Sequence, residues 1–320
     1  TTVYGEGIYV IIKESGIDAY IGVLFSIIIS IPFLLIFNFL FNYEPSLNIF
    51  EKNKKLFKYS FIPNLIFVLF SILISCIQFF NLTNFLVSQF LSETNPFIIG
   101  FIFSVLIIYL CSKDLSSLFK TSTIFLIINF NLFFISILGL FNEFSFKNLF
   151  PILENGIYFP FISAIKIFFI NICPLFLVLF VPKDKIINYN KNNTFISYFV
   201  YIILSLLMLI FTIGVLGGDL VKLYQYPEYI VLRRINFLNF LTRIENILFI
   251  QWIFGLFILM SFSAFIVKEK LKFKYNNIII GLLILILSLN CFKSLTIFNE
   301  FMYYIYPFIS FIFVIYIIIL

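Results

Sequence analysis

The sequence contains no histidine, and only 11% of its 320 residues are charged. Histidine is the commonest proton shuttle and the commonest metal ligand of proteins, so its absence removes the usual means of acid–base and metal chemistry. The four cysteines stand far apart, without the paired spacing of a zinc site or a disulfide framework. We therefore expect no enzymatic activity, no metal site and no cofactor.

Most of the chain is hydrophobic, and its apolar residues form long runs. Hydrophobic residues make up 62% of the chain and aromatic residues 21%, and the mean hydropathy is +1.12. Apolar runs of about 17 to 25 residues recur, and a helix of about 20 residues crosses a hydrocarbon layer of roughly 30 Å. The sequence therefore predicts an all-α polytopic membrane protein, with residues 1–320 forming a single integral membrane domain surrounded by lipid. The net charge of +6 is explained by membrane topology, so we expect no nucleic-acid partner.

The apolar runs predict about ten transmembrane helices, the first of them truncated. Nine full spans are expected at residues 19–41, 61–80, 97–110, 122–140, 156–181, 195–216, 247–267, 278–291 and 302–320. Residues 1–12 would be part of helix 1, residues 13–155 the rest of a first repeat, and residues 156–320 a second repeat. Because the chain begins with Thr1 in the middle of an apparent helix, we expect that residues before it are missing.

Lysine and arginine are unevenly distributed between the loops. Thirteen of them fall in one alternate set of loops and seven in the other. Cytoplasmic loops of membrane proteins carry the excess of basic residues. The richer set is therefore predicted to be cytoplasmic, and ten spans then place both chain termini inside the cell.

Two glycines bracket a carboxylate near the start, at Gly5, Glu6 and Gly7. Each glycine costs about 1 kcal/mol relative to alanine inside a helix. A carboxylate at membrane depth is expensive unless it meets a partner, a ligand or water. We expect an unwound segment in helix 1 whose free N–H groups line a small-molecule site, and the alternative is a small-residue notch for helix packing.

Two polar residues, Lys166 and Asn171, and a proline, Pro174, also interrupt the span at 156–181. Proline lacks an N–H and leaves a carbonyl of the preceding turn free. This predicts a second broken helix, and two paired breaks are typical of transporter folds with inverted repeats of five helices each. The two breaks would meet near the bilayer midplane and form the ligand site.

Two further features of this site stay open at the level of sequence. Glu6 and Lys166 could form an ion pair, since either charge alone costs at least about 2.5 kcal/mol in the membrane; alternatively, Lys166 extends its stem outward to the interface. Gln78 and Asn81 lie three positions apart on one helix face. They are predicted to face the ligand, or else to form hydrogen bonds between helices.

Four stretches, in order along the chain, resemble one known family. These are Gly5-Glu6-Gly7 with the polar turn of residues 13–20, the phenylalanine-rich run of residues 85–97 ending in Glu93-Thr94-Asn95-Pro96, residues 148–156, and residues 226–252. Together they resemble the B subunit of spore germinant receptors, the spore germination protein branch of the amino acid/polyamine/organocation permease superfamily. The sequence departs from the family pattern in helix six. Relatives often have a glycine near a glutamate there, whereas residues 171–176 of this sequence contain no acid.

The resemblance implies a subunit that senses a nutrient germinant in the spore inner membrane or the bacterial cytoplasmic membrane. Such a subunit binds a small nutrient, commonly an amino acid, and signals to A-type and C-type receptor subunits. An ion-coupled amino acid permease is the first alternative, since it would use the same site. A membrane enzyme acting on lipid-linked substrates is the second, but it would need acids or histidines clustered in a long aqueous loop, and the sequence has none.

Overall fold

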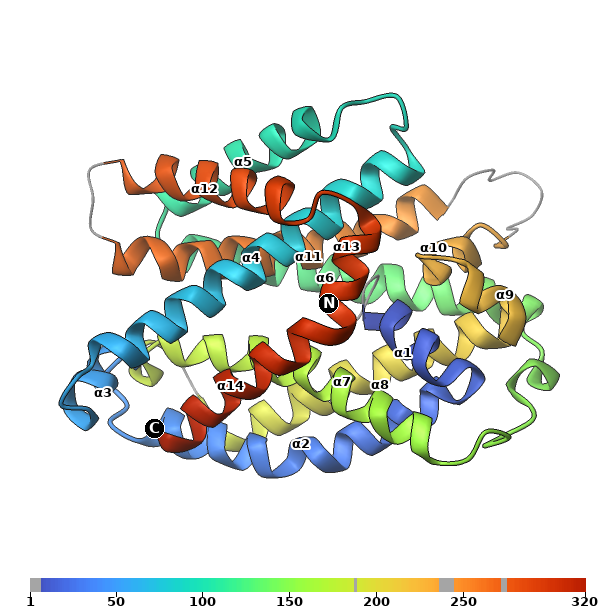
Figure 1. Ribbon diagram of the computed structural model, residues 1–320, viewed down its shortest axis with the longest axis horizontal. Helices are drawn as coiled ribbons and strands as arrows, with labels where there is room; N and C mark the ends of the chain where they lie inside the picture. Colours follow the sequence, from blue (N-terminus) through green and yellow to red (C-terminus); the bar gives the residue numbers. More distant parts are fainter. Residues whose placement is uncertain (1–6, 187–188, 236–244, 272–274) are drawn as a thin grey trace. The chain divides into compact units, whose positions relative to one another are not determined.

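The computed structural model describes residues 7–186, 189–235, 245–271 and 275–320, and every regular element within these ranges is a helix (Figure 1). Within these described ranges, seven helical segments are long and apolar enough to cross a membrane. They are Ile8–Asn42, Phe61–Gln89, Leu115–Glu143, Tyr158–Phe180, Asn192–Leu216, Ile250–Lys270 and Leu295–Ile319, and two shorter apolar helices cover Pro96–Ser112 and Asn276–Cys291. The prediction of an all-helical polytopic membrane protein is confirmed, whereas the ten-helix repeat remains a prediction.

The long helices lie close to the predicted spans. They are α2 (Ala19–Asn42), α4 (Phe61–Gln89), α5 (Pro96–Ser112), α6 (Leu115–Leu140), α7 (Tyr158–Phe176), α8 (Lys191–Leu216), α11 (Glu245–Lys270), α12 (Asn276–Cys291) and α14 (Tyr306–Ile319). Between them lie the short helices α1 (Ile8–Ser15), α3 (Ile49–Leu56), α9 (Gly218–Leu223), α10 (Pro227–Leu232) and α13 (Leu295–Glu300). A π-helical turn, Phe301–Ile305, joins α13 to α14.

The described chain divides into two compact units. The first comprises Phe61–Leu132 and Ile250–Phe301, and the second Thr2–Ser60, Phe133–Phe249 and Met302–Leu320. This division does not follow the predicted boundary between residues 155 and 156, so the paired repeats also stay a prediction.

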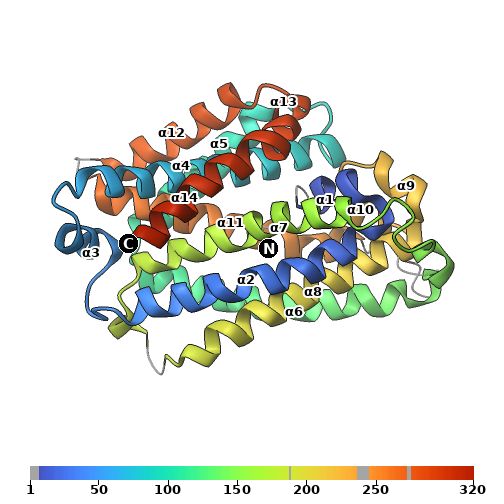
Figure 2. The same ribbon diagram turned by 60° about the horizontal axis from the view of Figure 1, so that its bottom comes forward.

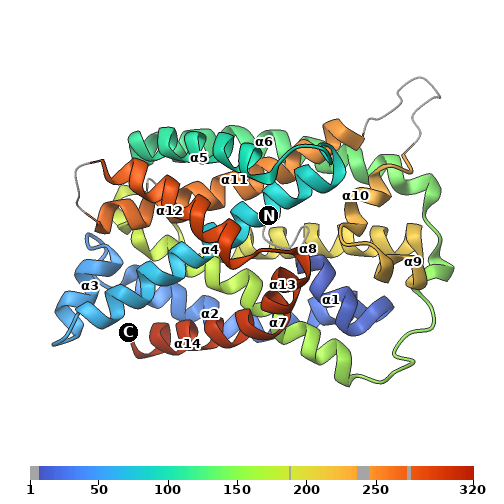
Figure 3. The ribbon, with the colours of Figure 1, turned by 45° about the horizontal axis from the view of Figure 1, so that its top comes forward.

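In the first unit, α5 and α12 pack against each other and both contact α4 (Figure 3). Glycine permits a close approach of α12 to α5, because a Cβ at Gly281 would overlap the side chain of Ile108. Helices α4 and α11 are joined by a buried hydrogen bond of 2.7 Å between Ser75 Oγ and Ser263 Oγ. Small residues and hydroxyl pairs of this kind are the usual means of holding membrane helices together.

In the second unit, α2 runs along α7, and α1, α8 and α14 pack around this pair (Figure 2). A Cβ at Gly22 would lie 2.9 Å from Ser163 Cβ and 3.0 Å from the carbonyl oxygen of Pro160. Only glycine at this position lets α2 and α7 approach so closely. The α2–α7 pair therefore forms a tight scaffold for the residues that α7 carries.

Helix α3 lies between two spans and is well defined by its own sequence. The side chain of Asn48 accepts a hydrogen bond from the N–H of Glu51, and the Glu51 carboxylate accepts one from the N–H of Asn48. This reciprocal pair is a capping box, which satisfies the free N–H groups at a helix start. On the buried face, Lys52 Nζ donates to the Leu40 carbonyl at 2.6 Å, at the C-terminal end of α2.

The predicted break at Pro174 does not have the expected form, whereas Gly5 and Glu6 of the other predicted break lie outside the described residues. Gly7 has right-handed helical angles, φ −64° and ψ −45°, and leads directly into α1. Helix α7 is continuous through Asn171 and Pro174 and changes to a 3-10 turn only at Leu177. The loss of the proline N–H removes a single hydrogen bond near the end of the helix, which the remaining bonds of the turn tolerate.

Candidate functional site

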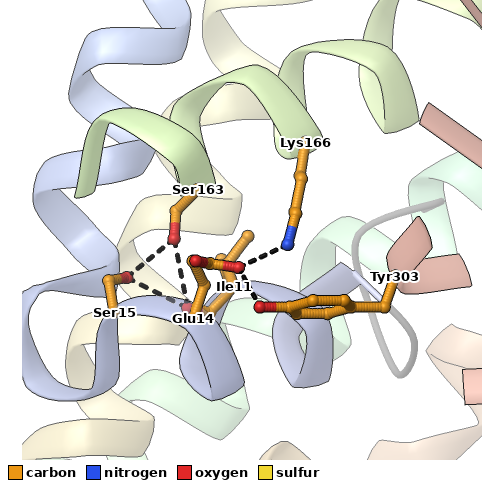
Figure 4. A network of polar contacts seen from close by, with 6 residues as sticks. All are labelled: Ile11, Glu14, Ser15, Ser163, Lys166 and Tyr303. Carbon is orange, nitrogen blue, oxygen red and sulfur yellow. Dashed lines mark hydrogen bonds and ion pairs between the residues drawn. The ribbon is translucent and has the colours of Figure 1, made fainter. Parts of the chain in front are cut away.

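A buried ion pair joins α1 to α7 within the second unit (Figure 4). Lys166 Nζ donates to Glu14 Oε2, and the two side chains are only 11% and 7% exposed. Removal of either partner from such a pair leaves an uncompensated buried charge, at a cost of about 3–5 kcal/mol. The pair therefore fixes how α1 and α7 face each other.

Tyr303 completes the cluster from a third element. Its hydroxyl donates to the same Oε2 of Glu14, and Lys166 Nζ lies 3.1 Å from the centroid of its ring. Tyr303 belongs to the π-helical turn that precedes α14. Turns of this kind occur often at functional sites, because they point a side chain where a regular helix would not.

Two serines hold the ends of α1 and α7 together beside the ion pair. Ser163 Oγ donates to Ser15 Oγ at 2.9 Å, and Ser15 Oγ in turn donates to the Ile11 carbonyl at 3.0 Å (Figure 4). Ser163 Oγ also lies 3.4 Å from that carbonyl oxygen. These bonds set the position of α7 along α1, so that Lys166 meets Glu14.

The chain leaves this site through a tight 3-10 turn, Gly16–Asp18. Gly16 has a φ of +58°, in the left-handed region that favours glycine. The carboxylate of Asp18 accepts a hydrogen bond of 2.9 Å from the N–H of Leu153, in the loop before α7. The turn thus ends α1 immediately after Glu14 and ties it to the segment that leads to Lys166.

The outcome for the first predicted break is mixed. Gly5 and Glu6 lie outside the described residues, and Gly7 is helical. The predicted partner of Lys166 was Glu6, but the carboxylate that the structure places on Lys166 belongs to Glu14. Lys166 is 9% exposed, so the alternative in which it extends outward to the interface is wrong.

Asn171 does not share the surroundings of Lys166, and Pro174 is a half-buried residue three positions further along α7. Five positions along α7 correspond to a rotation of about 140° at 3.6 residues per turn, so Asn171 lies on another face of the helix. Its Oδ1 accepts a hydrogen bond of 3.0 Å from Tyr201 on α8, and its Nδ2 is buried without an acceptor among the described residues. Lys166 therefore faces α1, whereas Asn171 faces α8.

Gln78 and Asn81 are buried in the first unit, with 5% and 1% of their surface exposed. Gln78 Oε1 and Asn81 Oδ1 find no hydrogen-bond donor within the described part of the chain. Buried carbonyl oxygens without a donor are rare and are usually satisfied by water, an ion or a ligand. The assignment of these two residues to a ligand site therefore stays a prediction.

Sequence reasoning missed Glu14 and Tyr303. Glu14 was assigned with Lys13 to a polar turn, whereas both residues belong to the last turn of α1 and the turn itself begins at Gly16. The adjacent charges inside an otherwise apolar helix could have indicated a buried carboxylate. No comparable signal marks Tyr303, which is one of 18 tyrosines.

The site offers donors and charges but no evident metal ligands. Among the described residues, no group of three His, Cys, Asp or Glu side chains could hold a metal ion. The cluster can bind a polar or charged group. Because Glu14, Lys166 and Tyr303 come from three different elements, such binding can change the contacts of all three elements.

The family comparison agrees with the resemblance drawn from the sequence. The model of the spore germination proteins, a permease-like family, matches residues 7–294. No curated protein matches the chain. The family match spans most of the sequence, including α1 with Glu14 and α7 with Lys166. The chain therefore belongs to the spore germination protein family.

Proposed function

We propose that this protein is the nutrient-sensing subunit of a spore germination receptor. It binds a small nutrient, such as an amino acid, and signals to A-type and C-type receptor subunits. It is located in the spore inner membrane or the bacterial cytoplasmic membrane, with both termini in the cytoplasm, and its helices form ten spans in two inverted repeats. Family membership supports the germination role, and the uneven distribution of basic loops supports the orientation.

The buried cluster of Glu14, Lys166 and Tyr303 is the observation that carries the sensing role. Ionisable residues inside membrane segments are costly and usually mark a binding site or an ion path. Here one carboxylate oxygen holds both a lysine and a tyrosine. A ligand that competes for any one of these bonds would loosen the junction of α1, α7 and the turn before α14, and this movement is the signal.

The ligand site is proposed to include residues beyond this cluster. Gly5, Glu6 and Gly7 lead into α1, and Asn171 and Pro174 lie further along α7. Gln78 and Asn81 belong to the first unit, and each has a side-chain oxygen without a donor among the described residues, so they stay separate candidates for contact with a ligand.

The test uses spores that lack this subunit and are complemented with variants. Tyr303→Phe removes one hydrogen bond but keeps the ring beneath Lys166, so we expect normal abundance and a weakened germination response. Tyr304→Phe is the matched control, because Tyr304 is 69% exposed and adjacent. If deletion of the gene leaves nutrient germination unchanged for every amino acid and sugar tested, the proposal is wrong.

An ion-coupled amino acid permease is the second candidate, favoured by the permease-like character of the family and the charged cluster. Reconstitution in proteoliposomes separates the two functions. Uptake of labelled amino acid above that of empty vesicles, lost in Lys166→Met, would establish transport. A protein that binds the amino acid without uptake is a sensor.

A further inference from the structure

Lys13 lies beside the buried ion pair but takes no part in it. Its Nζ is 5.4 Å from the centroid of the Tyr303 ring and 5.7 Å from that of Tyr9. Its side chain is exposed, and among the described residues no carboxylate lies within ion-pair distance of it. Lys13 and Lys166 thus share the ring of Tyr303, although only Lys166 has an acidic partner.

The charges of the cluster do not balance. Lys13 and Lys166 carry two positive charges, and Glu14 carries one negative charge that Lys166 already uses. The remaining positive charge stands beside this buried pair and has no acidic partner among the described residues. A site of this kind attracts an anionic group.

The contacts of Lys13 with other described residues supply no hydrogen-bond acceptor from the protein. Two tyrosine rings at more than 5 Å lie near the outer limit of about 6 Å for cation–π attraction. The position of Lys13 in the last turn of α1 is favourable toward the helix dipole, by about 0.3–1 kcal/mol at an exposed site. Neither contact supplies an acceptor for the three N–H donors of its ammonium group.

We propose that Lys13 binds the carboxylate of the ligand, next to the face of Tyr303. This assignment rests on the proposed sensing function and narrows it: the ligand is a small carboxylate-bearing molecule, such as an amino acid, and not a neutral sugar. When the carboxylate arrives, it neutralises the excess charge and adds a second anion beside Lys166. Lys166 then has two carboxylates near it, that of Glu14 and that of the ligand, and is no longer held by Glu14 alone.

Lysine reactivity in the purified full-length protein tests this directly. The amines are acetylated with a water-soluble ester, and the modification of Lys13 is followed by mass spectrometry. The probe is an equimolar mixture of the twenty standard L-amino acids, compared with a mixture of their uncharged-carboxyl amides. Lys222 is the internal control, because it is also exposed and its side chain lies beside Gly16 at the end of the same helix.

We expect the amino acid mixture to slow acetylation of Lys13 at least threefold, while the amides leave it unchanged and Lys222 reacts equally in both. Equal reactivity of Lys13 with and without amino acids overturns the assignment. Equal protection by the amides also overturns it, because the carboxylate would then be irrelevant.

A second test uses complemented spores. Lys13→Met should raise the half-maximal amino acid concentration for germination by about tenfold, the effect of losing one charge-assisted hydrogen bond, and Lys13→Arg should restore most of it. Lys222→Met should behave as wild type. If deletion of the gene abolishes germination but Lys13→Met responds normally at wild-type abundance, the sensing function stands and the carboxylate assignment fails. If deletion has no effect, the sensing function itself fails.

Discussion

Asn53 on α3 and Tyr316 on α14 form a buried pair across 263 positions of sequence. Asn53 Nδ2 donates to Tyr316 Oη at 2.9 Å, and Tyr316 Oη lies 3.2 Å from Asn53 Oδ1. The two residues are 0% and 5% exposed. The buried side-chain amide of Asn53 thus holds the C-terminal end of α14 against α3. Helix α14 is the helix that follows the turn with Tyr303.

The loss of this pair should destabilise the protein by the value of one buried hydrogen bond. We expect Asn53→Leu and Tyr316→Phe each to lower the free energy of unfolding by roughly 1 kcal/mol, because each removes the buried hydrogen bond between the two side chains. The double variant should lose little more than either single variant. Thermal unfolding in detergent measures this, and additive losses would show that the two side chains act independently.

The Glu14–Lys166 pair should show strong coupling. Glu14→Gln and Lys166→Met each leave one buried charge without its partner, at about 3–5 kcal/mol, whereas Glu14→Leu with Lys166→Met removes both charges and should recover much of that loss. Melting temperatures of the purified variants give the comparison. Glu6→Gln is the discriminating control: it should show no coupling with Lys166→Met, and a coupling as large as that of Glu14 would assign the pair to Glu6 instead.

Lys52 predicts a specific pH dependence of stability. Burial lowers its pKa to about 8 from the ordinary 10.5, against the opposing effect of the Glu44 carboxylate. The unfolded chain therefore holds this proton between pH 8 and 10.5 while the folded protein releases it, so the contribution of Lys52 to stability rises with pH in that window. Below pH 8 the cost of burying the charged amine is present in full.

The measurement compares melting temperatures of the wild type and Lys52→Met from pH 7 to 11. We expect the wild type to gain stability relative to Lys52→Met between pH 8 and 10.5. Lys54→Met is the matched control, since Lys54 is an exposed residue of the same helix and should follow the wild type. Parallel curves for the wild type and Lys52→Met would contradict the assignment.

Gly22 should tolerate no larger residue. A methyl group there meets Ser163 Cβ at 2.9 Å and a backbone oxygen at 3.0 Å, so Gly22→Ala forces α2 and α7 apart at a cost of about 1–3 kcal/mol. In an unconstrained helix the same change would stabilise by about 1 kcal/mol. A lower melting temperature of Gly22→Ala would therefore show that the close contact of α2 with α7 requires glycine, and a higher one would contradict it. Ile28→Ala is the control on the exposed face of α2.

The positions of the membrane helices follow from the sequence because apolar length alone determines them. The predicted span at 19–41 corresponds to α2 (Ala19–Asn42), and the Asn95-Pro96 turn begins α5 as expected. The form of the break at Pro174 did not follow, since proline lowers the stability of a helix without deciding whether tertiary packing keeps it intact. Pro174 was expected to interrupt α7 and does not.

The candidate site could be predicted only in part. Lys166 was identified because a lysine inside an apolar span needs a partner. The identity of that partner depends on the rotation of α1 about its axis and on the short turn at Gly16, which place Glu14 inward. Tyr303 joins Glu14 across 289 positions of sequence, and nothing in its local sequence distinguishes it from the other tyrosines.

The π-helical turn Phe301–Ile305 sets the register of the last helix. A π turn contains one residue more than an α turn, so its conversion to α form would rotate everything that follows by roughly 100° about the helix axis. Tyr303 lies within that turn and Tyr316 lies beyond it. The same rotation would therefore withdraw the hydroxyl of Tyr303 from Glu14 and the hydroxyl of Tyr316 from Asn53.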